Sequence, residues 1–159
     1  MLVPSLLVSL GMVILTVLIH FRGLSYLIAI LRGEPARRFR AHHSSWRQGA
    51  TILGVVFGLF FLHTIEISIY ALLFMYLEIF RTFEAALFYS AASFTTLGLD
   101  IVVERSEWRL VPAIEAISGF ILIGWSTAFL VSVTARMGLL EATLEQNVDP
   151  PPPRGENSP

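Results

Sequence analysis

The fold is decided by residues 83–102, which read Phe-Glu-Ala-Ala-Leu-Phe-Tyr-Ser-Ala-Ala-Ser-Phe-Thr-Thr-Leu-Gly-Leu-Asp-Ile-Val. Thr82 and Glu84 predict a helix start, because a hydroxyl caps the first turn and an acid there suits the helix dipole. Good helix formers follow through Ala92, and the hydroxylated and β-branched residues 93–98 end the pattern. A helix of about ten residues rises only about 15 Å, roughly half the hydrocarbon thickness of a bilayer. We therefore expect this apolar piece to enter a membrane and return.

Long apolar segments lie on both sides of this stretch. Irregular backbone at membrane depth is tolerated only where protein buries it or where it lines a water-filled cavity. A short helix followed by a loop, placed between two spans, therefore predicts the lining of a pore.

The composition agrees with a membrane protein, since 55% of the 159 residues are hydrophobic and only 14% are charged. A net charge of -1 argues against a nucleic-acid partner. The chain has no cysteine, which excludes a disulfide framework and any cysteine-ligated metal. We expect no cofactor other than a permeant K⁺ or Na⁺.

The pattern along the chain predicts an all-α membrane protein. It has three transmembrane helices, with a re-entrant pore helix and filter loop between the second and the third, as in a tetrameric pore domain. The expected segments are an extra N-terminal transmembrane helix over 1–31, a basic cytoplasmic loop over 32–49, an outer helix over 50–80, the pore helix and filter over 81–106, an inner pore-lining helix over 107–139 and a disordered cytoplasmic tail over 140–159. The first helix lacks a basic leader and a small-residue cleavage motif, so we interpret it as a retained span rather than a signal peptide.

The loop after the first span is rich in arginine. Five arginines lie between residues 32 and 47, with Glu34 as the single acid. The positive-inside rule places this loop in the cytoplasm, the N-terminus outside and the C-terminus inside, and we expect the plasma (inner) membrane. Arg37, Arg38 and Arg40 suit anionic lipid headgroups. We interpret His42–His43 as a solvated pair rather than a metal site, since no further ligand lies at suitable spacing.

The chain resembles the pore-loop cation channels, above all the bacterial two-transmembrane potassium-channel-like proteins, over about residues 50 to 135. The residues that carry the resemblance are Tyr89 and Ser90, Phe94 to Gly98, Asp100 to Val102, Glu107 to Leu110 and Gly124 to Ala128. In potassium channels the loop reads Thr-Val-Gly-Tyr-Gly-Asp, and its carbonyls replace the water shell of the ion.

The resemblance implies a selectivity filter formed by Thr95, Thr96, Leu97, Gly98, Leu99 and Asp100, with the permeant cation at Thr95, Thr96 and Gly98. This chain has the single residue Leu99 where the family has Tyr-Gly, so its filter is one residue short. We therefore predict a weakly selective channel for monovalent cations. A potassium-selective channel and a non-conducting membrane assembly subunit are the alternatives.

One re-entrant loop per chain cannot surround an ion, so we expect a homotetramer that closes a ring around the pore. In the inner helix, Gly119 and Gly124 are candidate gating hinges, with helix packing as the alternative role.

Three ionisable side chains within the second and third predicted spans are candidate functional residues. His63 and Glu66 are three residues apart and share one helix face, which suits either a pH-sensitive latch or a hydrogen-bonded link to neighbouring helices. Glu115 lies near the outer end of the inner helix and either braces the pore helix or reaches water.

An enzyme is the third class of protein that we considered. Gly124-Trp125-Ser126-Thr127 is similar to the Gly-x-Ser pattern of rhomboid-type intramembrane proteases, with His20 or His63 as a base. That family needs about six helices, whereas three spans and a hairpin are predicted here. We therefore expect that the protein is not an enzyme.

Overall fold

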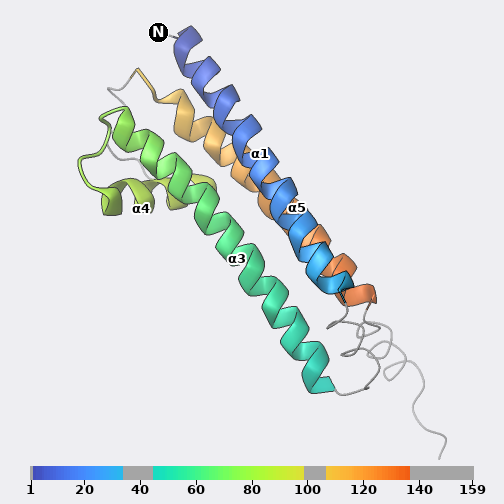
Figure 1. Ribbon diagram of the computed structural model, residues 1–159. Coiled ribbons are helices and arrows are strands. Elements are labelled where there is room, and N and C mark those ends of the chain that lie inside the picture. The colour runs from blue at the N-terminus through green and yellow to red at the C-terminus, as the bar shows by residue number, and fades with distance from the viewer. Residues whose placement is uncertain (1, 34–44, 99–106, 137–159) are drawn as a thin grey trace, which may run out of the picture.

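A computed structural model describes residues 2–33, 45–98 and 107–136 of the chain. These residues form four helices, α1 (Leu2–Arg32), α3 (Ser45–Tyr76), α4 (Phe83–Phe94) and α5 (Leu110–Arg136), and contain no strand. Helices α1 and α5 run side by side in the same direction, α3 runs the opposite way, and the short α4 crosses near the carboxyl end of α3 (Figure 1). The prediction of an all-α fold is confirmed.

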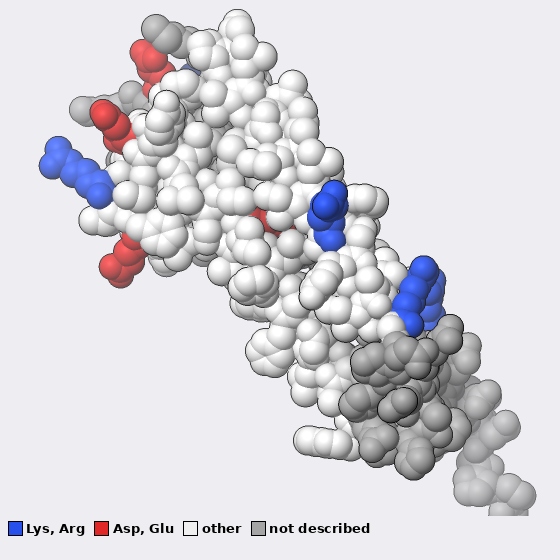
Figure 2. Space-filling view, in the orientation of Figure 1, with Lys and Arg blue, Asp and Glu red and all other residues white. Residues whose placement is uncertain are grey.

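Three of the helices are long enough and apolar enough to cross a membrane, namely α1, α5 and the part of α3 from Gly49 to Tyr76. Helix α4 has 12 residues and rises about 18 Å, which is too short to cross. Charged side chains gather toward the two ends of the elongated molecule, and most of the visible surface between them carries none (Figure 2). The protein is therefore a membrane protein with one short helix among three spans.

The helix ends differ from the predicted bounds at several places. Helix α3 begins at Ser45, five residues before the predicted start, because the prediction followed the apolar run, whereas a helix continues through polar residues such as Arg and Gln. It ends at Tyr76, before the predicted end at residue 80, because Glu78 adopts a positive φ of 59°. The Ile79 and Glu78 amides then donate to the Phe74 and Met75 carbonyls, both at 3.0 Å, which is a Schellman cap.

Helix α4 begins as the sequence predicts. The Thr82 hydroxyl accepts a hydrogen bond from the Ala85 amide at 3.4 Å, and Glu84 lies in the first turn. The helix continues to Phe94, two residues beyond Ala92, because Ser93 and Phe94 are buried against α3 and α5 rather than released into the loop.

Leucines of one helix lie over glycines of the other where α1 packs on α3. A Cβ atom added to Gly23 would come within 2.6 Å of the Leu62 side chain, and one added to Gly58 within 2.7 Å of Leu27. Small residues let helix backbones approach closely, which is the main source of packing energy between helices in lipid. The N-terminal helix is therefore closely packed on the rest of the fold.

The carboxyl end of α3 holds α4 through an aromatic cluster. The Phe74 and Tyr89 rings are 5.5 Å apart and nearly perpendicular, and the Phe80 and Tyr89 rings are 5.0 Å apart. Such offset and edge-to-face pairs stabilise beyond the area that they bury. The cluster fixes the first half of α4 against the outer span.

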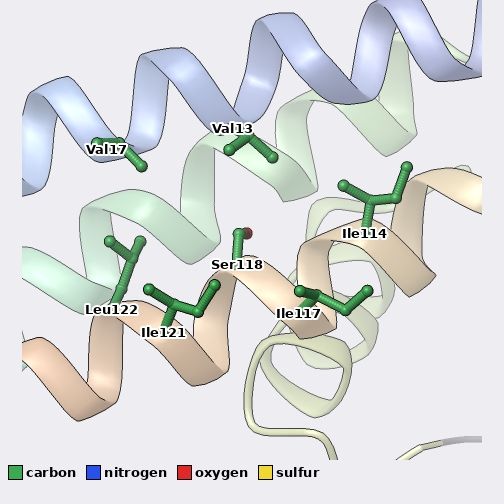
Figure 3. Close-up of a pocket in the computed structure, with 7 residues that line it drawn as sticks. All are labelled: Val13, Val17, Ile114, Ile117, Ser118, Ile121 and Leu122. Atoms are coloured by element: carbon green, nitrogen blue, oxygen red, sulfur yellow. The ribbon is translucent and has the colours of Figure 1, made fainter.

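Packing between α1 and α5 is less complete. A recess of about 250 Å³ opens between the two helices and is lined by Val13, Val17, Ile114, Ile117, Ser118, Ile121 and Leu122 (Figure 3). Apart from Ser118, whose hydroxyl donates to the Glu115 carbonyl at 3.0 Å, the lining is aliphatic. The recess is therefore an apolar surface with no group that would bind an ion.

The positive φ of Glu78 gives a stability prediction. A left-handed conformation costs a residue with a Cβ atom about 1–2 kcal/mol, so Glu78→Gly should stabilise the protein by up to about 1 kcal/mol. Thermal unfolding in detergent micelles measures this change. The matched control Glu84→Gly, in the first turn of α4, should destabilise by about 1 kcal/mol. A loss of stability in Glu78→Gly would contradict the assigned conformation.

Candidate functional site

The loop that follows α4 folds back on the end of the helix. The Leu97 amide donates to the Ala92 carbonyl and the Thr96 amide to the Ser93 carbonyl, both at 2.9 Å, which forms a second Schellman cap. Thr96 has a φ of 59° and Gly98 a φ of 64°. A β-branched residue rarely adopts this conformation, so Thr96, the second residue of the predicted filter, is a strained position.

The predicted filter residues that the structure describes lie on the surface of the single chain. Thr95, Thr96, Leu97 and Gly98 are all exposed, and the Leu97 side chain is 71% exposed. The Thr95 hydroxyl donates back to the Ala91 carbonyl at 2.8 Å, so it stabilises the end of α4. Leu99 and Asp100 lie outside the described residues. Four adjacent positions of the predicted filter therefore lie on one exposed loop.

Hydrogen bonds from Ser90 hold the middle of α4 between α3 and α5, an arrangement that we call the bracket. The Ser90 hydroxyl lies 2.9 Å from the Ile67 carbonyl of α3 and 2.5 Å from Glu115 Oε1 of α5. Both Ser90 and Glu115 are fully buried. Of the two roles considered for Glu115, the contacts favour bracing of the pore helix.

When Glu115 is ionised, the bracket has one proton, that of the Ser90 hydroxyl, for two acceptors. A serine hydroxyl has one proton, and the Ile67 carbonyl can only accept. If Ser90 donates to that carbonyl, the contact with Glu115 needs a proton on the carboxyl group. Glu115 Oε2 is buried and has no hydrogen-bond partner among the described residues, and a neutral carboxyl leaves no buried charge there.

The end of α4 touches α5 at Gly119. A Cβ atom on Gly119 would overlap the Phe94 carbonyl and would lie 2.8 Å from the Phe94 ring. At Gly124 a Cβ atom would meet nothing within 4 Å in the same chain. Gly119 therefore packs against the last residue of the pore helix, and α5 is one continuous helix through both glycines.

A second polar site connects α1, α3 and α5. Glu66 Oε1 lies 2.8 Å from His20 Nδ1, and Glu66 Oε2 lies 2.9 Å from His63 Nδ1. The Ser126 hydroxyl lies 3.0 Å from His63 Nε2 and 3.4 Å from His20 Nε2. These four side chains close a ring of hydrogen bonds, which we call the polar ring. His20 and Glu66 are fully buried, and the His63 side chain is 18% exposed.

Counting protons shows how the polar ring is satisfied. Its four hydrogen bonds need four protons, one for each. When Glu66 is ionised and both imidazoles are neutral, the Ser126 hydroxyl and the two imidazoles supply only three. One further proton, on an imidazole or on the carboxyl group, gives every contact one donor and one acceptor. The polar ring is then electrically neutral, which is the favourable state for a group buried inside a membrane.

Sequence reasoning placed His63 and Glu66 on one helix face but missed the pairing of Glu66 with His20. The signal was present, because His20 lies in the apolar run of residues 2–21, which contains no Asp, Glu, Lys or Arg, and an ionisable group there needs a partner. His20, His63 and Glu66 are also the group of described residues that could hold a metal ion, since one donor atom from each lies within 4.8 Å of the others.

Comparison with protein families gives one match. Residues 51–136, more than half of the chain, match the ion channel family, and they span α3 from Thr51, α4 and α5. The chain belongs to the ion channel family. Comparisons with curated proteins and with solved structures found no match. Helix α1 precedes the matched region and is joined to the channel fold by the polar ring.

The family also decides how Ser126 is interpreted. Ser126, His63 and Glu66 follow the hydrogen-bond order of a serine hydrolase triad. However, Ser126 is only 5% exposed and lies in the middle of α5, where the helix itself uses the backbone amides that an oxyanion hole would need. The protein is a channel and not an enzyme.

The contact at Gly119 gives a prediction with a matched control. Gly119→Ala should destabilise the channel by about 1–3 kcal/mol, because the added methyl group overlaps the Phe94 carbonyl. Gly124→Ala should be neutral or stabilising by about 0.5–1 kcal/mol, since it only improves helix propensity. Thermal unfolding in micelles measures both. Equal effects of the two substitutions would contradict the packing of α4 on α5.

Glu66 gives a second prediction. Glu66→Gln should cost less than about 1.5 kcal/mol, because an amide can accept from one imidazole and donate to the other. Glu66→Leu should cost about 2–5 kcal/mol, because it leaves both imidazoles without their partner. Unfolding of the two variants in the same detergent makes the comparison. A leucine variant as stable as the glutamine variant would show that the polar ring does not hold the helices.

Proposed function

We propose that the protein is a homotetrameric channel that passes monovalent cations down their gradient with weak selectivity. The observation that carries the proposal is the exposed loop Thr95–Gly98 at the end of a helix too short to cross the bilayer. Lipid offers no partners to irregular backbone. Sister copies around a water-filled axis would shelter this loop, and one loop per chain makes a closed ring the simplest arrangement.

Cation preference follows from the dipoles and charges near the loop. Four copies of α4 would direct their carboxyl ends toward the axis and add negative potential there. On the outer side, the sequence has five acids between residues 78 and 107 and three arginines between residues 81 and 109, a difference of two charges per chain. This excess of two negative charges per chain favours a negative vestibule at the outer mouth of the pore, which concentrates cations.

The proposal of weak selectivity between K⁺ and Na⁺ depends on Leu99. The filter would be formed by the carbonyls of Thr95 to Gly98, followed by Leu99 and Asp100, with the cation at Thr95, Thr96 and Gly98. With Leu99 in place of Tyr-Gly, this path has fewer ordered sites in single file than a potassium filter, so K⁺ and Na⁺ are poorly distinguished. Conduction needs no cofactor beyond the permeant ion.

The strained Thr96 and the two glycines of α5 are the parts proposed to respond during gating. Gly124 has free space beside it and suits a hinge in α5, whereas Gly119 is in contact with Phe94 and would have to separate from it. We propose both glycines as hinge positions.

The proposed orientation follows from the basic residues. Arg32 and Arg136 lie in the last turns of α1 and α5, at the end of the bundle where the arginine-rich segment 32–47 begins. By the positive-inside rule this end faces the cytoplasm of a cell with the channel in its plasma (inner) membrane, and Arg37, Arg38 and Arg40 meet anionic lipids there.

Flux through proteoliposomes tests the proposal. Purified channel should carry K⁺ and Na⁺ at comparable rates and should exclude Cl⁻. A reversal potential set by K⁺ alone would support the potassium-selective alternative, and no flux of any ion would support the non-conducting assembly subunit.

Restoring the missing residue tests the filter itself. Leu99→Tyr-Gly should shift the reversal potential in mixed K⁺ and Na⁺ toward that of K⁺, because it restores the length and the aromatic residue of a potassium filter. Leu99→Ala-Gly, which restores length alone, is the control and should shift it less. An unchanged reversal potential in both variants would show that this loop is not the filter.

A further inference from the structure

We propose that the polar ring is a binding site for a divalent transition metal of the Zn²⁺ class, with His20, His63 and Glu66 as ligands. The site would lie between α1 and α3, next to the end of α4, where the His63 ring lies 5.5 Å from the Phe94 ring, and the proposal does not depend on which ion the channel conducts. The donor atoms, their distances, their burial and the position of Ser126 support it.

The donor set selects the class of metal. Two imidazoles and one carboxylate are a set that proteins use for Zn²⁺, with a fourth position left open. Imidazole nitrogen suits Zn²⁺, Cu²⁺, Ni²⁺ and iron, whereas Mg²⁺ and Ca²⁺ take oxygen donors. The permeant K⁺ or Na⁺ of the proposed function would also be coordinated by oxygen, so this site would not be a binding site for the permeant ion.

The distances are close to those of a metal site. With bonds of about 2.0–2.1 Å, the donors of a tetrahedral zinc site lie about 3.3 Å apart. Glu66 oxygens now lie 2.8 Å from His20 Nδ1 and 2.9 Å from His63 Nδ1, and the set as a whole lies within 4.8 Å. A metal would therefore move each carboxylate–imidazole pair apart by about half an ångström and draw the two imidazoles together. Side-chain rotation can supply shifts of this size.

Ser126 completes the site as a support for both histidines. A ligating imidazole usually donates its other N–H to an oxygen, which fixes the ring and its tautomer. With both Nδ1 atoms on the metal, both Nε2–H groups would face the Ser126 oxygen, which now lies 3.0 Å from His63 Nε2 and 3.4 Å from His20 Nε2. A serine oxygen has two lone pairs and can accept both hydrogen bonds.

Burial preorganises two of the ligands and leaves an approach at the third. His20 and Glu66 are fully buried among packed helices, and the Trp125 ring lies 5.5 Å from the His20 ring. His63 is the ligand with an exposed edge, at 18% of its side chain. A metal would enter at His63, replace the hydrogen bonds to Glu66 and connect α1 with α3 by direct bonds.

Cobalt titration tests the site, because Co²⁺ replaces Zn²⁺ and absorbs visible light strongly when four-coordinate with protein ligands. The full-length channel should be purified in detergent with an affinity tag that contains no histidine, and Zn²⁺ should then displace the bound Co²⁺. We expect saturable absorption at one Co²⁺ per chain. The substitutions His20→Gln, His63→Gln and Glu66→Gln should each weaken binding by more than about tenfold, and Ser126→Ala by about tenfold.

Two controls separate this site from other donors in the chain. His42→Gln/His43→Gln removes the other two of the four histidines, and Glu115→Gln removes the second buried carboxyl group of the described spans. Both variants should bind Co²⁺ as the unchanged protein does. Circular dichroism and size exclusion should show that the glutamine variants keep their helices and their assembly, since glutamine can still hydrogen-bond within the polar ring.

The proposal is overturned if the unchanged protein gives no four-coordinate Co²⁺ spectrum, or if folded His20→Gln, His63→Gln and Glu66→Gln variants bind as tightly as it does. Loss of binding in the His42→Gln/His43→Gln control would place the metal in the loop instead and would also overturn it. None of these readouts uses ion flux, so a failure of the metal site is distinguishable from a failure of the proposed conduction.

Discussion

The fold depends on one constraint, which is that lipid cannot hydrogen-bond to the backbone. Helix α4 is too short to cross the hydrocarbon layer and is followed by irregular backbone, so both must be held by protein. The structure meets this need from two sides, with the Ser90–Glu115 bracket at the middle of the helix and the Gly119–Phe94 contact at its end. The two hydrogen bonds of the cap, from the Thr96 and Leu97 amides to the Ser93 and Ala92 carbonyls, fix the start of the loop. The position of the loop is therefore determined by both α3 and α5.

The polar ring is the second place where polar groups are paired inside the membrane. An isolated imidazole or carboxylate there would be costly, but a closed set with matched donors and acceptors carries no net charge. The pairing also draws contributions from three helices, since His20, Glu66 and Ser126 belong to α1, α3 and α5. It also borders the end of α4, because the His63 ring lies 5.5 Å from the ring of Phe94, the last residue of that helix.

The arrangement of three spans and one short helix could be predicted because it follows from the number and the lengths of the apolar segments. The Thr82 cap and the shared face of His63 and Glu66 were also predictable, since both depend on residues three positions apart. The partner of Glu66 was not, because His20 lies 46 positions away and hydropathy does not say which faces of two helices meet. For the same reason the contact of Gly119 with Phe94 was not predictable from the sequence. Helix ends were least predictable, since Glu78 stops α3 through its backbone conformation.

The packing of α1 has a consequence for the whole protein. Its leucine and glycine contacts with α3 and its histidine in the polar ring make it a structural part of the subunit rather than a detachable membrane anchor. A subunit truncated before α3 would keep every residue of the matched channel region, yet Glu66 would have one imidazole partner instead of two, and the surfaces of α3 and α5 that α1 covers would be open. For this protein, the minimal folding unit is therefore larger than the minimal pore.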